Sequence, residues 1–284
     1  DLTLHRCSQR RHDHPRLRPN TDISVMQMAP SETTRYGGPD QTGTDAMPLP
    51  RPTPPEPARG PGRPQLPAPA MNPVDPGTLE PLERQVYRTI RKSMMQGHIR
   101  PDAILSGRAI AQSLGISVQP VRDALKRLEA EGLVEGRPQS GFVLPPMTRR
   151  EYWETIEIRT RIEGLAGGLA VPRMTPAKIA RLRIQNRKLH EARTSEDYLA
   201  RNFAFHFAIY SEARRGTLMS LIENFWVRIV PVLHHHPVEG GESMAYAKHE
   251  DIIGALEAGD AALVETTIRS DIEEAAEKVM RCLA

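Results

Sequence analysis

The sequence predicts a mainly α-helical protein with two folded parts: a smaller one that ends in a β-hairpin and a larger one built from helices alone. Three observations support this. Apolar residues recur at helical spacing through most of residues 78–284, and only a short stretch near residues 133–144 has strand character. Residues 1–77 lack such periodicity and hold 16 of the 26 prolines. The 284 residues therefore fit two modest domains and leave a long segment over.

Residues 1–77 are predicted to be a disordered, proline-rich tail. Nine Lys/Arg nearly balance eight Asp/Glu there, and apolar runs are few. Such a segment buries too little apolar surface to offset the entropy of the chain. The stretch 48–69 is typical of an extended polyproline linker, and a proline-rich ligand for a partner is the alternative. Met71 is a candidate natural start, in which case residues 1–70 would not belong to the natural protein.

Composition narrows the function classes. The two cysteines, Cys7 and Cys282, lie at opposite ends of the chain and support neither a disulfide framework nor a cysteine-based metal site. No apolar stretch approaches the roughly 18 residues that span a bilayer, and no signal peptide is visible, so we expect no membrane partner and a cytoplasmic location.

The distribution of charge is more informative than the net charge of +3. Residues 78–146 carry ten Lys/Arg against seven Asp/Glu, whereas residues 150–284 carry 18 against 20. The basic excess therefore lies in the smaller domain, where binding to phosphate groups would require it.

Residues 78–146 are predicted to form a winged helix-turn-helix. The expected order is a helix from Leu82 to about Gly97, helices over 107–114 and 118–131, and a hairpin of strands 133–135 and 142–144. Gly115 permits a tight turn between the second and third helices, and Ser117 is a suitable N-cap with Pro120 in the following turn. In this arrangement the third helix places polar side chains in the major groove of DNA.

The third helix is expected to bury Val121, Leu125 and Leu128 and to expose Gln119, Arg122 and Lys126. Arg122 can donate to a guanine edge or to a phosphate, and Gln119 can pair with adenine. The N-terminus of the helix also suits a phosphate. Taken singly, these are ordinary solvated residues. Taken with the turn, the cap and the wing, they indicate double-stranded DNA as the partner.

A near-continuous pattern covers residues 82–144, including Gly97-His98-Ile99-Arg100-Pro101, Leu114-Gly115-Ile116-Ser117, Pro120-Val121-Arg122-Asp123-Ala124-Leu125 and Ser140-Gly141-Phe142-Val143. It resembles the GntR family of bacterial transcription regulators. The resemblance implies DNA contacts at Arg108, Gln119, Pro120, Arg122 and the wing around Gly141, and Ser117 and Lys126 complete the predicted DNA-binding set. The family usually has an arginine after the capping serine, where this chain has Val118, so the operator sequence does not carry over.

Residues 148–284 are predicted to form an antiparallel bundle of about six helices, over 148–171, 175–193, 195–212, 215–236, 241–258 and 260–281. Polar residues interrupt their apolar stripes. The third helix has the stripe Leu199, Phe203, His206 and Ile209, with Asn202 on the face of His206. On the fifth, His249 leads Ile252, Ile253 and Leu256. On the sixth, Asp271 lies among Val264, Ile268, Ala275 and Val279.

Three helices thus each turn a potential metal ligand inward, and one shared cation would satisfy all of these buried polar groups. Satisfied core histidines, and a pairing of Asp271 with a buried arginine, are the open alternatives. Arg159 lies four residues before Glu163, which indicates either an intrahelical ion pair or an anchor for a carboxylate effector whose other end meets the metal. The run His234–His236 is expected to be a solvated helix end.

The pattern Arg159…Glu163…Ala166, Asn202…Phe205-His206, His249…Ile252 and Gly259-Asp260…Asp271 resembles the FCD-type effector domain of the FadR-type branch of the same family. Metal-containing members have an Asp four residues before a His, and two further His. The corresponding positions here are Asn202, His206, His249 and Asp271. This set retains one carboxylate and two imidazoles, which suits zinc, nickel or manganese. The resemblance also favours Arg159 as the effector-binding residue.

Two functions fit these features. The first is a ligand-responsive transcription regulator, a repressor by the commoner habit of the family, in which a small organic acid shifts the two DNA-binding domains of a homodimer on a palindromic operator. The second is a metal-dependent enzyme built on the helical domain, because two histidines and a carboxylate also describe non-haem iron sites. The sequence contains no HExxH motif and no further inward carboxylate placed as a base, so we expect no catalytic residues.

Overall fold

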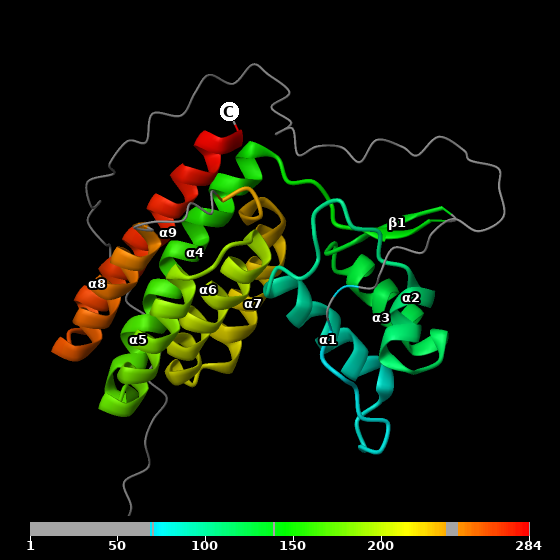
Figure 1. The fold of residues 1–284 in the computed structure, drawn as a ribbon, viewed down its shortest axis with the longest axis horizontal. Helices are drawn as coiled ribbons and strands as arrows, with labels where there is room; N and C mark the ends of the chain where they lie inside the picture. Colours follow the sequence, from blue (N-terminus) through cyan, green and yellow to red (C-terminus); the bar gives the residue numbers. More distant parts are fainter. Residues whose placement is uncertain (1–68, 70, 139, 237–243, 284) are drawn as a thin grey trace, which may run out of the picture. The chain divides into compact units, whose positions relative to one another are not determined.

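The computed structural model describes residues 69, 71–138, 140–236 and 244–283. Within that part the protein is mainly helical, as the sequence predicts, and its strands form an antiparallel hairpin (Figure 1). The tail expected over residues 1–77 lies almost wholly outside the described residues, so its disorder stays a prediction.

Three helices and the hairpin make up the N-terminal part of the described chain. Helix α1 spans Leu82–Met95, α2 spans Gly107–Leu114 and α3 spans Val118–Ala130. Each helix turns an apolar face inward, and the resulting core includes Val86, Ile90, Ile110, Val121, Leu125 and Leu128, all of them buried. The predicted apolar faces of α1 and α3 are therefore confirmed.

The turn between α2 and α3 follows the predicted chemistry. Gly115 ends α2 in the left-handed region, with φ +67°, which glycine adopts without steric cost. Ser117 occupies the N-cap position of α3 with an extended backbone, but its side chain makes no capping bond. The Ser117 hydroxyl is therefore left exposed at the start of the helix that carries Gln119 and Arg122.

The hairpin pairs β1 (Glu135–Arg137) with β2 (Gly141–Val143), so that Glu135 lies opposite Val143. The first strand begins two residues later than predicted. The amide of Leu133 donates to the carbonyl of Leu128 and closes the end of α3, which holds Leu133 and Val134 in the core rather than in the strand.

The second domain contains all six predicted helices, with ends that differ from the prediction by at most three residues. They are α4 (Arg149–Ala170), α5 (Pro176–His190), α6 (Ser195–Tyr210), α7 (Gly216–Leu233), α8 (Met244–Ala258) and α9 (Ala261–Leu283). Short 3₁₀ turns, η1 (Val171–Arg173) and η2 (Ser211–Ala213), follow α4 and α6. Threonines at positions 148, 175 and 194 cap α4, α5 and α6 through their side chains.

Helix α9 packs along α4 and α8, and α5 lies beside both α6 and α8 (Figure 1). The buried hydroxyl of Tyr152 on α4 donates to the carbonyl of Ala276 on α9, at 3.2 Å. The inward face of α6 differs from the predicted stripe, because Phe205 and Tyr210 are fully buried whereas Phe203 is only partly covered. This packing directs one face each of α6, α8 and α9 toward a common interior.

Helix α7 corrects the expectation that no apolar stretch approaches the length of a membrane span. Its 18 residues have a mean hydropathy of 1.2, which suffices for a span by length and composition alone. The core helix of a soluble protein meets the same criteria, and α7 buries Trp226, Ile229 and Val230 within the described structure. The composition of α7 is therefore weak evidence for a membrane.

Candidate functional site

The side chains predicted to contact DNA lie on the outside of α2 and α3. Arg108, Gln119, Arg122 and Lys126 are exposed, and Pro120 is half-buried in the first turn of α3. Val118, where the family usually has arginine, is also half-buried and packs against the core, so it adds less apolar surface than its sequence position suggests.

The cations of this surface are available for an external anion. Within the described part of the chain, Arg108, Arg122 and Lys126 form no ion pair, whereas Arg127 on the same helix pairs with Glu83 and Glu131. Gln119 donates a 2.8 Å hydrogen bond to Asp123, so its amide must rotate away from that partner before it can pair with a base.

The wing is held close to the loop before α2. Leu105 and Phe142 exchange two backbone hydrogen bonds, of 2.7 and 3.0 Å, which the sequence did not predict. Gly141 precedes this contact with φ +116°, and a Cβ there would lie 2.6 Å from the carbonyl oxygen of Leu105. Only glycine fits such a backbone conformation and approach, so Gly141 has a structural reason for its place in the wing.

Three of the four predicted metal ligands meet in the interior of the helical domain. His206 on α6, His249 on α8 and Asp271 on α9 are all buried, and each offers a ligand atom within 4.8 Å of the other two. The Nε2 atom of His206 lies 3.2 Å from His249 Nε2 and 3.3 Å from Asp271 Oδ2, and His249 Nε2 lies 3.9 Å from Asp271 Oδ1.

These spacings fit a cation. A tetrahedral zinc ion with bonds of about 2.0–2.1 Å requires ligand atoms about 3.3 Å apart. Two imidazole nitrogens and a carboxylate oxygen are also ligands that zinc and nickel accept. The Nδ1 atom of His249 is buried without a hydrogen-bond partner among the described residues, so the cluster is not fully satisfied by its own contacts. The alternative in which Asp271 pairs with a buried arginine is not what the structure shows.

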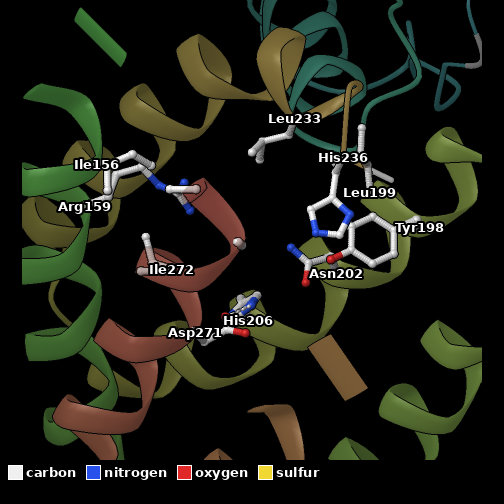
Figure 2. A pocket seen from close by; sticks show the side chains of 12 residues that line it. Ile156, Arg159, Tyr198, Leu199, Asn202, His206, Leu233, His236, Asp271 and Ile272 are labelled. Carbon is white, nitrogen blue, oxygen red and sulfur yellow. Dashed lines mark ion pairs between the residues drawn. The ribbon is translucent and has the colours of Figure 1, made fainter. Parts of the chain in front are cut away.

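Asn202 is placed less directly. It lies one turn before His206 on α6 and lines the same pocket as His206 and Asp271, but it is only half-buried (Figure 2). Its amide oxygen is a candidate fourth ligand on the open side of the cluster.

Burial controls the protonation of the cluster. Removal from water lowers the pKa of His249 to about 3, against the opposing influence of Asp271. Burial alone would raise the pKa of Asp271, but hydrogen bonding to His206 and the nearby charges of the two histidines and Arg159 outweigh it and lower that pKa. A neutral imidazole and an ionised carboxylate are the forms that bind metals.

Arg159 and Glu163 form the ion pair that their spacing suggested, and it is deeply buried. The Nε atom of Arg159 lies 2.6 Å from Glu163 Oε1, with 5% and 0% of the two side chains exposed. Trp226 donates from Nε1 to the other carboxylate oxygen at 3.0 Å, and its ring faces the Arg159 guanidinium at 4.9 Å. Arg159 nevertheless lines the pocket, so the pairing and the predicted anchor role do not exclude each other.

The pocket connects these features. It has an empty volume of about 420 Å³, part of which is open solvent. Figure 2 shows Arg159 on one side, Tyr198, Asn202 and His236 on the other, and His206 and Asp271 between them. His236 is buried and stacks on Tyr198, with ring centroids 4.8 Å apart. The expectation of a solvated run at residues 234–236 is therefore wrong for His236, because the end of α7 turns this ring into the pocket.

Sequence reasoning missed several residues of this site. Phe205 stacks on His249, Tyr210 bonds His206, and Trp226 bonds Glu163. Each looks like an ordinary core aromatic in the sequence. The signal that was available is spacing: Tyr210 follows His206 by four residues and therefore shares its helix face.

A helix-turn-helix with an exposed basic helix, followed in the chain by a helical domain with a polar pocket, defines a DNA-binding regulator with a second, non-DNA-binding domain. Residues 82–144 match the family described as "Bacterial regulatory proteins, gntR family", and residues 154–274 match the FCD domain. The chain belongs to the GntR family of transcriptional regulators and carries an FCD domain.

Relatives of known name agree with this assignment. The HTH-type transcriptional regulator McbR of Escherichia coli (strain K12) is 33% identical over 157 residues, which are 54% of this chain and 71% of that protein. The repressor RspR of the same strain is 27% identical over 70% of this chain and 90% of its own length. A probable D-xylose utilization operon repressor of Paenarthrobacter nicotinovorans is 28% identical over 64% and 81% of the two chains.

Solved structures show the same fold. E. coli McbR/YncC superposes with a TM-score of 0.64 and 27% identity, over 72% of this chain and 99% of that chain. A GntR regulator from Rhodococcus sp. RHA1 has a TM-score of 0.57 at 19% identity, over 70% and 97% of the two chains. Families and relatives are transcriptional regulators rather than enzymes, so the enzyme alternative is dropped.

Proposed function

We propose that this protein is a ligand-responsive repressor whose helical domain binds a small organic acid through a divalent metal. The observation that carries the proposal is the convergence of His206, His249 and Asp271 at the wall of a pocket that also contains Arg159. Two relatives named as repressors support the direction of regulation. Zinc, nickel and manganese are the candidate ions for this ligand set, completed by Asn202.

Arg159 is the proposed anchor for the carboxylate of the effector. Its Nε and Nη2 atoms bond Glu163, at 2.6 and 3.3 Å, and no described residue bonds Nη1. A guanidinium has five N–H donors in a planar fork, so the edge that faces away from Glu163 can still take a carboxylate. An acid bound there would lie in the same pocket as the metal ligands.

The DNA-binding surface is proposed to consist of Arg108, Ser117, Gln119, Pro120, Arg122, Lys126 and the wing at Gly141. We further propose a homodimer in the cytoplasm on a palindromic operator. One domain of this size covers little DNA, and repetition of the contact over two half-sites supplies the affinity. The effector acts if it binds the DNA-bound and free forms with different affinity.

A gel-shift experiment tests the function. The zinc-loaded protein is titrated onto the DNA upstream of its own gene, with and without a panel of small carboxylic acids, and the series is repeated with a chelator. At least one acid should weaken DNA binding only when metal is present. The matched control is His206→Ala, which should bind the DNA but not respond. If no acid changes DNA binding, or if the chelator leaves the response intact, the metal-dependent effector model is wrong.

A further inference from the structure

A tyrosine hydroxyl joins the metal cluster to the buried ion pair. The Oη atom of Tyr210 lies 3.1 Å from Nδ1 of His206, on the side of the imidazole away from His249 and Asp271. Tyr210 is also hydrogen-bonded to the carboxylate of Glu163. The three side chains are buried, with 0% exposure of Tyr210 and Glu163 and 2% of His206, so water does not supply alternative partners.

The direction of these two hydrogen bonds determines which nitrogen of His206 carries a proton. The phenol has one proton and can donate it either to Glu163 or to His206 Nδ1. If it donates to Glu163, its oxygen must accept from an Nδ1–H group. If it donates to Nδ1, the His206 proton lies on Nε2, the atom that faces His249 and Asp271.

Glu163 is the stronger acceptor. Hydrogen bonds to ionised groups are about twice as strong as bonds between neutral groups, and the carboxylate is fixed by Arg159 and by Trp226 Nε1. Burial and then the charge of Glu163 raise the pKa of Tyr210 well above its ordinary value, so the phenol keeps the proton that it donates. The reverse direction would place the phenol oxygen against the carboxylate without a proton between them.

We propose that Glu163 and Tyr210 are positioning residues, which hold a proton on Nδ1 of His206 and leave Nε2 as the nitrogen that coordinates the metal. This inference rests on the proposed metal-binding role of His206. It gives the Arg159–Glu163 pair a second consequence, because the carboxylate that faces the effector anchor also orients a metal ligand. Such outer partners typically change metal affinity by about 10–100-fold when they are removed.

The bland alternative is that Tyr210 is a core tyrosine that uses His206 as a convenient acceptor. In that case its removal would lower stability without changing the tautomer in the way proposed. Tyr152 provides the matched control, because it is a second fully buried tyrosine whose hydroxyl bonds a backbone carbonyl outside the cluster. Tyr152→Phe and Tyr210→Phe remove the same atom from similar surroundings.

The test is ¹⁵N NMR of histidine-labelled, metal-free full-length protein, with the His206 signals assigned from the spectrum of His206→Gln. We expect a proton on Nδ1 of His206 in the wild type and in Tyr152→Phe. In Tyr210→Phe that proton should move to Nε2, where Asp271 accepts it. Glu163→Gln, whose amide can donate to the tyrosine oxygen, should shift the proton in the same direction. A wild-type His206 without a proton on Nδ1, or an unchanged tautomer in both variants, would overturn the proposal.

Zinc titration gives the second readout and separates this proposal from the proposed function. Tyr210→Phe should bind zinc about 10–100-fold more weakly than the wild type, and Tyr152→Phe should not. If the wild type has the expected tautomer but binds neither zinc, nickel nor manganese, the proposed function fails and the hydrogen-bond assignment stands. If the wild type binds zinc and Tyr210→Phe binds it equally well, the positioning role fails and the metal site stands.

Discussion

The imidazole of His249 lies flat against the ring of Phe205, with ring centroids 3.9 Å apart and an angle of 5° between the planes. This stack fixes the plane of the imidazole and keeps its Nε2 atom 3.2 Å from Nε2 of His206. It also contributes to the burial that lowers the pKa of His249 to about 3. His249 is therefore neutral at physiological pH, which is the state that a metal ligand requires.

The stability of the metal-free protein should depend on pH through His249. Its pKa is about 3 in the folded state, whereas an unfolded histidine titrates near 6.5, so between these values the unfolded state binds more protons. The contribution of His249 is thus complete above about pH 6.5 and is lost as the pH falls toward 3, by at most about 1.4 kcal/mol per pH unit. Urea unfolding on both sides of the ordinary histidine pKa measures it. His249→Phe keeps an aromatic ring for the stack and cannot titrate, so its stability should vary less with pH; equal slopes would show that His249 is not the source.

Asn202→Asp should tighten zinc binding. The change replaces a neutral amide oxygen with a carboxylate at the open side of the cluster, and we expect a gain of about tenfold, equivalent to about 1.4 kcal/mol. Isothermal titration with zinc measures the change. Asn224→Asp, which adds the same charge at an exposed position of α7, is the control and should leave the affinity unchanged. A loss or no gain for Asn202→Asp would remove Asn202 from the ligand set.

Arg122→Ala should weaken specific DNA binding by about 1–3 kcal/mol if Arg122 contacts a base edge. If it contacts only phosphate, the loss should be equal across sequences and the salt dependence should become shallower by about one unit. Arg88→Ala removes an arginine of α1 that pairs with Glu80, and DNA binding should survive it. A recognition role for α3 does not hold if Arg122→Ala binds DNA as Arg88→Ala does.

Gly141→Ala should distort the wing. The new Cβ would lie 2.6 Å from the Leu105 carbonyl oxygen, at a backbone φ of +116° that side chains rarely adopt. Such strain costs about 1–3 kcal/mol, and we expect a lower melting temperature together with weaker DNA binding. Gly216→Ala is the control, because nothing lies within 4 Å of a Cβ there and the residue begins α7. Equal melting temperatures for the two variants would refute the argument.

Helical periodicity and helix-end signals were sufficient to predict every helix and three of the buried ligand positions, because a stripe of apolar residues determines which face a His or Asp shares. The sequence could not show which residues from other helices meet them. Phe205 was left off the predicted stripe, and Trp226 meets Glu163 across 63 residues of chain. The first strand was misplaced because apolar Leu133 and Val134 suit a helix end as well as a strand.

Metal content tests the central claim most directly. The full-length protein is stripped with a chelator, reloaded with zinc, dialysed and analysed for metal and melting temperature, beside His206→Ala treated in the same way. We predict one zinc per chain and a higher melting temperature for the wild type, and no retained zinc and no shift for His206→Ala, because bound metal stabilises only the folded state. If the wild type retains no zinc, and neither nickel nor manganese shifts its melting temperature, then His206, His249 and Asp271 form a polar core cluster and the account is wrong.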